Sequence, residues 1–396
     1  MGILLALVVI YFACIIIARA SDGFEAAADY LGRNLTDGVK GATINAIGSS
    51  LPELMTTFFF LVLLKDAEGF ASGLGTTAGS AIFNGVIIPA TVIFVVVLGG
   101  LAKGIELSRK VIIRDGITLI VCELILIFFI SGNELRAIHG LLLMFLYAGY
   151  VAIMLLGMTK NEFKVSPADF SPERDPLLNK NQNPLLTALF FSWLDLPRWL
   201  FSRPNRNKAI GLLAFSAIIM GFACHLLVEA CIWLGSDEFT LFGSTFAGVG
   251  IPVYFLSVIV ASAATSLPDT ILSMKDARKG NYDDAVSNAL GSNIFDICFA
   301  LGFPLFLYTL IYGPIDMTTS STSDVGELRI LLLAVTGLAF LIFFKSRSMK
   351  LKQAWMLVAL YGLFSVYIIG RALGWTALEP LAETLNNISN YLGGLF

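Results

Sequence analysis

The chain has 396 residues, of which 57% are hydrophobic and only 14% are charged, and its mean hydropathy is +0.80. Soluble proteins carry roughly a quarter charged residues, so this composition excludes an ordinary soluble domain and predicts an all-α polytopic membrane protein. The net charge of −3 says nothing about partners; from the apolar composition we expect the lipid bilayer, and no nucleic acid, as the partner.

Ten apolar stretches are long enough to cross a membrane, since a spanning helix needs about 20 predominantly apolar residues. They lie near 3–20, 39–64, 72–100, 111–130 and 138–158, and then near 209–233, 244–274, 283–312, 328–345 and 353–373. The sequence therefore divides into a first five-helix unit (1–158), a polar linker (159–208), a second five-helix unit (209–375) and a C-terminal tail (376–396).

Three segments need separate interpretation. Ala18-Arg19-Ala20 looks like a cleavage site, but no basic residue precedes the apolar run, so we expect a retained first span. Residues 183–205 mix aromatics, leucines and arginines, which indicates an interfacial helix on the membrane surface. The C-terminal tail has similar features, and we expect it to lie on the opposite surface.

The basic residues are distributed unevenly between alternate loops. One set of loops, which includes the linker, holds 22 of the 26 Lys and Arg residues; the other set keeps Lys65, Arg136, Arg329 and Arg371. Such an excess marks cytoplasmic loops. We therefore expect both termini outside, and the cell (inner) membrane as the location.

The two units share an internal repeat. Ser50-Leu51-Pro52-Glu53 matches Ser266-Leu267-Pro268-Asp269, and "GSAIFN" (79–84) matches "GSNIFD" (291–296). Because each unit has five spans, similar units must insert in opposite senses, which predicts two inverted repeats. Inverted repeats place a binding site near the midplane, at broken helices.

The repeat gathers oxygen ligands in the middle of the membrane. Proline lacks an N–H and clashes with the preceding turn, so we expect the carbonyls of Ala46 and Ser262 to be freed. The full set of expected ligands is Ala46, Ser49, Ser50, Glu53, Ser80, Asn84, Ser262, Thr265, Ser266, Asp269, Ser292 and Asp296. An all-oxygen set suits hard cations such as Ca²⁺, Na⁺ or K⁺ rather than copper or zinc.

The carboxylates carry the strongest signal, because an acidic group inside a membrane is expensive and functional by default. A lone serine such as Ser80 or Ser292 also fits simple helix packing or bonding to its own backbone. Glu123, in the fourth span, is open to three interpretations: it is paired, it faces the bundle interior, or it lies near the membrane boundary.

The two motif pairs, "GATINAIGSSLPEL" with "GSAIFN" and "ASAATSLPDTILS" with "GNYDDAVSNALGSNIFD", resemble the alpha-repeats of sodium/calcium exchangers in the cation/Ca²⁺ antiporter superfamily. Asp269 and Asp296 make the second repeat similar to the potassium-dependent branch. The resemblance implies ten transmembrane helices, Ca²⁺ and Na⁺ held between the second, third, seventh and eighth, and sliding of the first and sixth. It implies Glu53 and Asp269 as the central Ca²⁺ carboxylates.

The function expected from these features is antiport of Ca²⁺ against Na⁺, with K⁺ as a candidate co-transported ion, no cofactor and no enzymatic activity. A monomer is compatible with the sequence. The first alternative is a Ca²⁺/H⁺ antiporter of the same superfamily, although Ser-Leu-Pro without a nearby histidine fits Na⁺ better. An aspartyl protease using Asp269 and Asp296 is disfavoured by Glu53 and Asn84 at the matching positions, and a channel by the inverted repeat.

Overall fold

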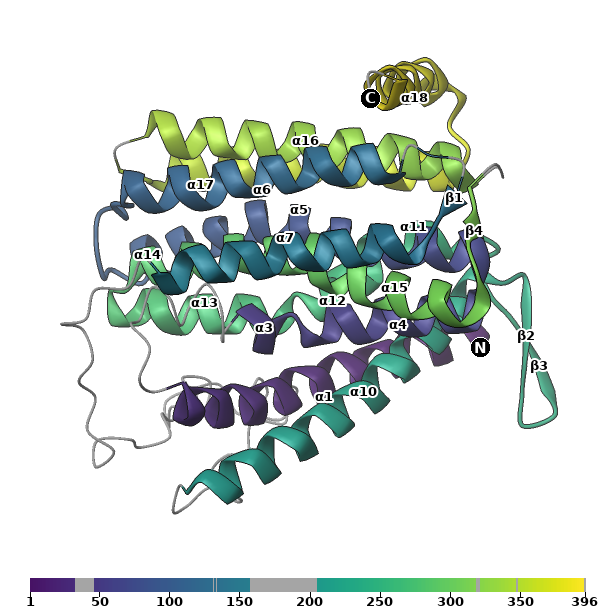
Figure 1. Cartoon of the computed structure of the whole chain (residues 1–396), viewed down its shortest axis with the longest axis horizontal. Helices are drawn as coiled ribbons and strands as arrows, with labels where there is room; N and C mark the ends of the chain where they lie inside the picture. Colours follow the sequence, from purple (N-terminus) through teal and green to yellow (C-terminus); the bar gives the residue numbers. More distant parts are fainter. Residues whose placement is uncertain are drawn as a thin grey trace.

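The computed structural model describes residues 1–32, 46–130, 132, 134–156, 205–317, 321–346 and 348–394. The described chain is helical apart from four short strands (Figure 1). In chain order the elements are α1 (Gly2–Leu31), α3 (Ala46–Ser49), α4 (Leu51–Leu64), α5 (Asp66–Leu98), α6 (Arg109–Ile130), β1 (Glu134–Leu135), α7 (Ala137–Leu156), α10 (Arg206–Gly235), β2 (Glu238–Leu241), β3 (Ser244–Ala247), α11 (Val253–Leu256), the π-helical turn η5 (Ser257–Ala261), α12 (Ser262–Thr265), α13 (Leu267–Lys279), α14 (Tyr282–Phe295), the π-helical turn η6 (Asp296–Ala300), α15 (Gly302–Tyr312), β4 (Ile315–Asp316), α16 (Ser321–Lys345), α17 (Leu351–Ala372), η7 (Thr376–Leu378) and α18 (Glu379–Gly394).

Eight helical segments of the described residues are long and apolar enough to cross a membrane. The prediction of a multi-pass helical membrane protein is therefore confirmed at this level. Two of the ten predicted spans fall outside these eight. The helix α4 is shorter, with 14 residues, and α6 carries Arg114, Asp115 and Glu123 within its apolar sequence.

Some predicted boundaries are wrong. The first span continues well beyond residue 20, because α1 runs to Leu31. The stretch 244–274 does not start as a helix: residues 238–247 form the β2–β3 hairpin, and the helix begins at Val253 after Pro252. The predicted interfacial helix at 183–205 lies almost entirely outside the described residues. In the tail, α18 lies across the direction of the spans (Figure 1).

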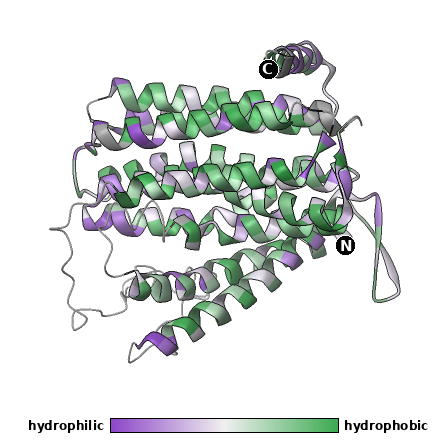
Figure 2. Ribbon diagram, viewed as in Figure 1, coloured by the Kyte–Doolittle hydropathy of each residue, from purple (hydrophilic) through white to green (hydrophobic). Residues whose placement is uncertain are grey.

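The spanning helices run roughly side by side, with the N-terminus, the β2–β3 hairpin and α18 at one end of the bundle (Figure 1). Colouring by hydropathy shows apolar residues along the helices and polar ones gathered toward their ends (Figure 2). The helices α1 and α10 pack closely against each other. With neighbouring faces of α4, α11 and α12 they form a second hydrophobic cluster, distinct from the large one around α5, α14 and α16.

Contacts between the two halves are reciprocal. The helix α7 packs on α15 and α17 packs on α5, while α6 packs on α14 and α16 on α5. The segments that connect these helices also pair between the two halves. Strand β1, between α6 and α7, pairs with β4, between α15 and α16. At the other end of the bundle, Ile105, between α5 and α6, pairs with Met349, between α16 and α17. Each half therefore contributes two connecting segments, one at each end of the bundle, and each of them pairs with a connecting segment of the other half.

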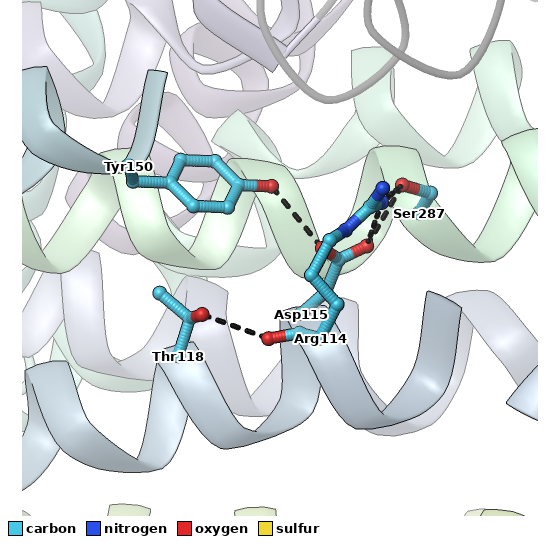
Figure 3. Close-up of polar contacts among 5 residues, drawn as sticks. All are labelled: Arg114, Asp115, Thr118, Tyr150 and Ser287. Atoms are coloured by element: carbon cyan, nitrogen blue, oxygen red, sulfur yellow. Dashed lines mark hydrogen bonds and ion pairs between the residues drawn. The ribbon is translucent and has the colours of Figure 1, made fainter. Parts of the chain in front are cut away.

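A buried ion pair holds α6 inside this bundle (Figure 3). Asp115 is fully buried and receives two bonds from the neighbouring Arg114, Nε to Oδ1 at 2.6 Å and an Nη to Oδ2 at 2.8 Å. Ser287 of α14 donates to Oδ2 at 2.9 Å, and the Tyr150 hydroxyl of α7 reaches Oδ1 at 3.4 Å. The Asp115 carboxylate, which lies within a predicted span, is therefore neutralised by Arg114 and hydrogen-bonded by Ser287 and Tyr150. These contacts join α6, α14 and α7.

Replacing Asp115 with Asn should destabilise the protein, because Arg114 would lose its counter-charge. Breaking a buried pair costs about 3–5 kcal/mol; the Arg114 side chain is 34% exposed, and solvent screening reduces our expectation to about 1–3 kcal/mol. Thermal unfolding in detergent measures the change. The matched control is Glu134→Gln, whose partner Arg136 is 65% exposed, and which should leave the melting temperature nearly unchanged. An equal shift in both variants would contradict this role for Asp115.

Candidate cation site

Two helices are interrupted at matching positions of the internal repeat. The chain breaks at Ser50 between α3 and α4, and at Ser266 between α12 and α13, with ψ of 7° and −2° at the two serines. Each proline then lies in the first turn of the new helix, where a missing N–H removes no helical bond. As a result, Glu53 and Asp269 both occupy the first turn of a helix, where the helix dipole favours negative charge.

The adjoining helices bring the second pair of motifs to the same place. Ser80 and Asn84 lie one turn apart on α5, as do Ser292 on α14 and Asp296, which begins η6. The helix α5 approaches closely because it carries glycine there: a side chain at Gly79 would collide with the Val258 carbonyl of η5. Small residues commonly permit such contacts between membrane helices.

A chain of hydrogen bonds connects the carboxylates of the two repeats. Ser80 Oγ donates to Glu53 Oε1 at 3.0 Å and lies 2.8 Å from Ser266 Oγ. Asn84 Nδ2 lies 3.3 Å from Ser80 Oγ and donates to Asp269 Oδ2 at 3.0 Å. Thus α5 bridges Glu53 and Asp269 through two side chains, and an acid from each half meets in one polar cluster.

The other side of Asp269 is held by the remaining serines. Ser292 Oγ donates to Asp269 Oδ1 at 2.8 Å, and Ser49 Oγ lies 3.5 Å from Ser292 Oγ. All the side chains of this cluster are inaccessible to solvent except Ser49, which is 4% exposed. The cluster is therefore enclosed, and its polar side-chain atoms are oxygens except for the amide nitrogens.

Several oxygens in the cluster are buried without a hydrogen-bond partner among the described residues. They are Ser50 Oγ, Glu53 Oε2, Asn84 Oδ1 and both carboxylate oxygens of Asp296. Leaving a buried polar group unpaired costs about 1–3 kcal/mol, and more for a charged one. Acceptor oxygens in this state are suited to a cation, which would satisfy them together. This chemistry fits Ca²⁺, Na⁺ or K⁺ as transported substrates.

Two of the predicted ligands are backbone carbonyls, those of Ala46 and Ser262. The Ser262 carbonyl is not free here: it accepts the Ser266 N–H at 3.0 Å and the Thr265 hydroxyl at 3.1 Å. The expectation for this carbonyl is wrong, since a missing N–H at Pro268 concerns the carbonyl four residues earlier, at Ala264, and not that of Ser262. A cation at Ser262 would have to displace the Thr265 hydroxyl. Ala46 is placed as the first residue of α3.

The carboxylates do not form a metal cluster by themselves. Within the described ranges, no group of three or more His, Cys, Asp and Glu side chains is close enough to hold a metal ion. Hydroxyl and amide oxygens must therefore complete any coordination shell, which is a weaker arrangement than a carboxylate cage and suits an ion that has to leave again.

Two features of the cluster escaped the sequence interpretation. Asn288 is fully buried, donates toward Ser273 Oγ at 3.4 Å and leaves its Oδ1 unpaired. It lies four residues before Ser292, so helical spacing gave a usable signal. The π-helical turns η5 and η6 gave none. Such turns are frequent at functional sites, and η6 begins at Asp296.

Glu123 faces the bundle interior. Its side chain is fully buried, and Oε1 accepts the Thr336 hydroxyl of α16 at 2.7 Å. Of the three interpretations of this residue, the interior one is confirmed.

The five cysteines are free, and four of them are buried.

Comparison with known proteins agrees with this geometry. A family model described as sodium/calcium exchanger protein matches residues 5–156 and 208–370. The protein "Sodium/potassium/calcium exchanger 5" of Homo sapiens is 26% identical over 371 residues, covering 78% of this chain and 71% of that protein. Two solved structures share the fold. The H⁺/Ca²⁺ exchanger CAX aligns with a TM-score of 0.61 at 14% identity, covering 99% of this chain and 92% of that one. The sodium-calcium exchanger NCX_Mj aligns at 0.52 and 18%, covering 91% and 97%.

The helical bundle and its enclosed oxygen site define a multi-pass membrane transporter of the cation-exchanger class, not an enzyme. The chain belongs to the sodium/calcium exchanger protein family. It is a cation/Ca²⁺ exchanger of that family. The family binds transported Ca²⁺ and Na⁺ ions.

Removing the Ser80 hydroxyl should weaken Ca²⁺ binding, because Ser80 orients Glu53 and joins the two repeats. Hydrogen bonds to charged groups contribute about 1.5–3 kcal/mol, so we expect Ser80→Ala to raise the dissociation constant about tenfold or more in calorimetric titrations. The control is Ser72→Ala, two turns earlier on α5, because Ser72 is equally buried and its hydroxyl has no hydrogen-bond partner among the described residues. Equal Ca²⁺ affinity in the two variants would remove Ser80 from the site.

Proposed function

We propose that the protein is a secondary active antiporter that exchanges Ca²⁺ for Na⁺ by alternating access. The observation that carries this proposal is the buried cluster in which Glu53 and Asp269, from opposite halves, are bridged by Ser80 and Asn84. The cluster is oxygen-rich, it contains unpaired acceptors, and it lies at two helix interruptions.

Charge explains how two ions would be coupled. Glu53, Asp269 and Asp296 supply up to three negative charges, and charge in a membrane interior needs compensation. Three Na⁺ would neutralise all three, whereas one Ca²⁺ would leave one charge over. That remaining charge calls for a monovalent ion or a proton. Because both ions use the same carboxylates, neither fills the site fully while the other is present, and competition couples their movements in opposite directions.

The architecture supports the alternating mechanism. The reciprocal pairing of β1 with β4 and of Ile105 with Met349 is what two inverted five-helix repeats, at 1–158 and 209–375, would produce. The helices α1 and α10 pack closely against each other within the smaller hydrophobic cluster and would slide as a pair against the rest.

An ion-pair contact links the proposed sliding pair to the site helices at one end. Lys275 of α13 lies 3.0 Å from Asp22 and 3.3 Å from Glu25, both on α1. Sliding of α1 past α13 would have to break these contacts. We assign this end to the cytoplasm on the excess of basic residues in its loops, with both termini outside and the cell (inner) membrane as the location.

The second candidate is Ca²⁺/H⁺ antiport. It is supported by the burial of three carboxylates with no Lys, Arg or His in ion-pair contact within the described residues. Burial disfavours the charged form of a carboxyl group, so a proton can neutralise such a group as well as a metal cation. The hydroxyl-rich surroundings favour Na⁺.

Reconstituted protein distinguishes the two candidates. Proteoliposomes should accumulate ⁴⁵Ca²⁺ when an outward Na⁺ gradient is imposed, and a pH gradient alone should produce little uptake. In the same assay, Glu53→Gln should abolish uptake because it removes the charge that both ions need. Glu123→Gln is the matched control and should retain uptake. It changes a second fully buried glutamate, which is hydrogen-bonded to Thr336 and separate from the site. Uptake driven only by the pH gradient would overturn Na⁺ coupling in favour of H⁺ coupling.

The potassium requirement is tested at Asp296, whose two carboxylate oxygens have no hydrogen-bond partner in the described structure. If this charge is matched by co-transported K⁺, wild-type Na⁺-driven uptake should increase with K⁺, and Asp296→Asn should make uptake indifferent to it. The rate is measured over a K⁺ series with Na⁺ and Ca²⁺ held constant. A K⁺ response that survives in Asp296→Asn would assign the requirement elsewhere.

A further inference from the structure

A groove opens on the outer surface of the bundle between α16 and α17, away from the cation site. Its volume is about 610 Å³, within the range of small-molecule sites. Its lining includes Leu338, Leu341 and Lys345 from α16 and Lys352, Met356 and Ala359 from α17. On each helix the residues recur at helical spacing, so one face of each forms a wall.

The groove has a polar mouth and an apolar interior. Lys345 ends α16 and Lys352 lies in the first turn of α17. Gln353 donates to the Ser346 hydroxyl at 3.2 Å and fixes the rim between them. Deeper in the groove, all the lining side chains are apolar, and several are open to the surroundings: Leu338 and Leu341 are each 49% exposed and Leu363 is 72% exposed.

The depth of the groove corresponds to one leaflet of a bilayer. Leu363 lies 11 positions after Lys352 on α17, a rise of about 16.5 Å along a helix. Half of the hydrocarbon core is about 15 Å. A molecule with its polar part at the two lysines and its apolar part along the groove would therefore extend from the membrane boundary to near the midplane.

The two lysines have no anionic partner in the described structure. Neither forms an ion pair with a carboxylate there. A third cation at this end, Arg109, lies over the ring of Phe344, 5.6 Å from its centroid, so it is already engaged. Lysine side chains at such boundaries place the charge in the headgroup layer.

We propose that this groove is a binding site for one anionic phospholipid, whose phosphate contacts Lys345 and Lys352 and whose acyl chain lies along α16 and α17. Basic pockets between membrane helices are known to select acidic headgroups. The site is independent of the exchange reaction proposed above. Because α16 and α17 both pack on α5, a lipid there would also cover the outer side of the helices that support Ser80 and Asn84.

The test is native mass spectrometry of the full chain in neutral detergent, titrated with dioleoyl phosphatidylglycerol or with dioleoyl phosphatidylcholine. The tails are identical, so a difference reports the headgroup. We expect one phosphatidylglycerol to bind at least tenfold more tightly than phosphatidylcholine. The double variant Lys345→Gln/Lys352→Gln should lose this preference, while Lys345→Arg/Lys352→Arg should keep it. Ala359→Trp should weaken binding of both lipids, since it fills the apolar part without changing charge.

The matched control is Arg206→Gln/Lys208→Gln, which removes two charges from the start of α10 and should leave the preference intact. Glycerol 3-phosphate, which has the charge without the tails, should compete poorly. Equal binding of the two lipids by wild type, the same loss of preference in the α10 control, or full competition by glycerol 3-phosphate would each overturn the proposal. A retained preference in the double glutamine variant would also exclude this groove.

Discussion

Three carboxylates buried without a cationic side chain against them impose the constraint on which this structure depends. In the bilayer interior an uncompensated charge is expensive, and the part of the chain described here brings no Lys, Arg or His to Glu53, Asp269 or Asp296. Asp115 shows the contrast, because its charge is compensated locally by Arg114. The missing counter-charges at the site must come from outside the protein. The helix interruptions, the serines and Asn84 surround these carboxylates.

The two hydrophobic clusters divide the molecule into parts with different tasks. The larger cluster surrounds α5 and α14 and carries most of the polar site. It is closed at both ends by short strand pairings between the halves. The smaller cluster contains α1 and α10, and ion pairs of the largely buried Lys275 join α1 to α13. Apolar faces can slide with little change in buried area, whereas bonded strands cannot, and this contrast supports the sliding of α1 and α10 proposed above.

Sequence reasoning succeeded where a strong local rule applied. The hydropathy pattern predicted a multi-pass helical bundle, and the repeated Ser-Leu-Pro-acid motif identified the two interruptions. It placed Glu53, Asp269, Ser80, Asn84 and Ser292 in one cluster, which the hydrogen bonds show. It failed where the outcome depends on tertiary contacts. Strand β3 lies at the start of a stretch, 244–274, that is apolar enough to pass for a helix. The expectation for the Ser262 carbonyl failed for a local reason, because that carbonyl accepts the Ser266 N–H and the Thr265 hydroxyl. Asn288 had the right spacing but no motif to draw attention to it.

The β2–β3 hairpin has a mechanical consequence. It follows α10 directly, and the start of α1 packs against β3 so closely that a side chain at Gly2 would collide with Ala247. Backbone bonds from Gly248, Val249 and Gly250 return to residues 234–237, which ties the hairpin base to the end of α10. In the sliding movement proposed above, a displacement of the α1–α10 pair would be taken up on this side in the few residues before Val253. Gly250, with φ of 71°, and Pro252 lie in that short connector and would form its hinge.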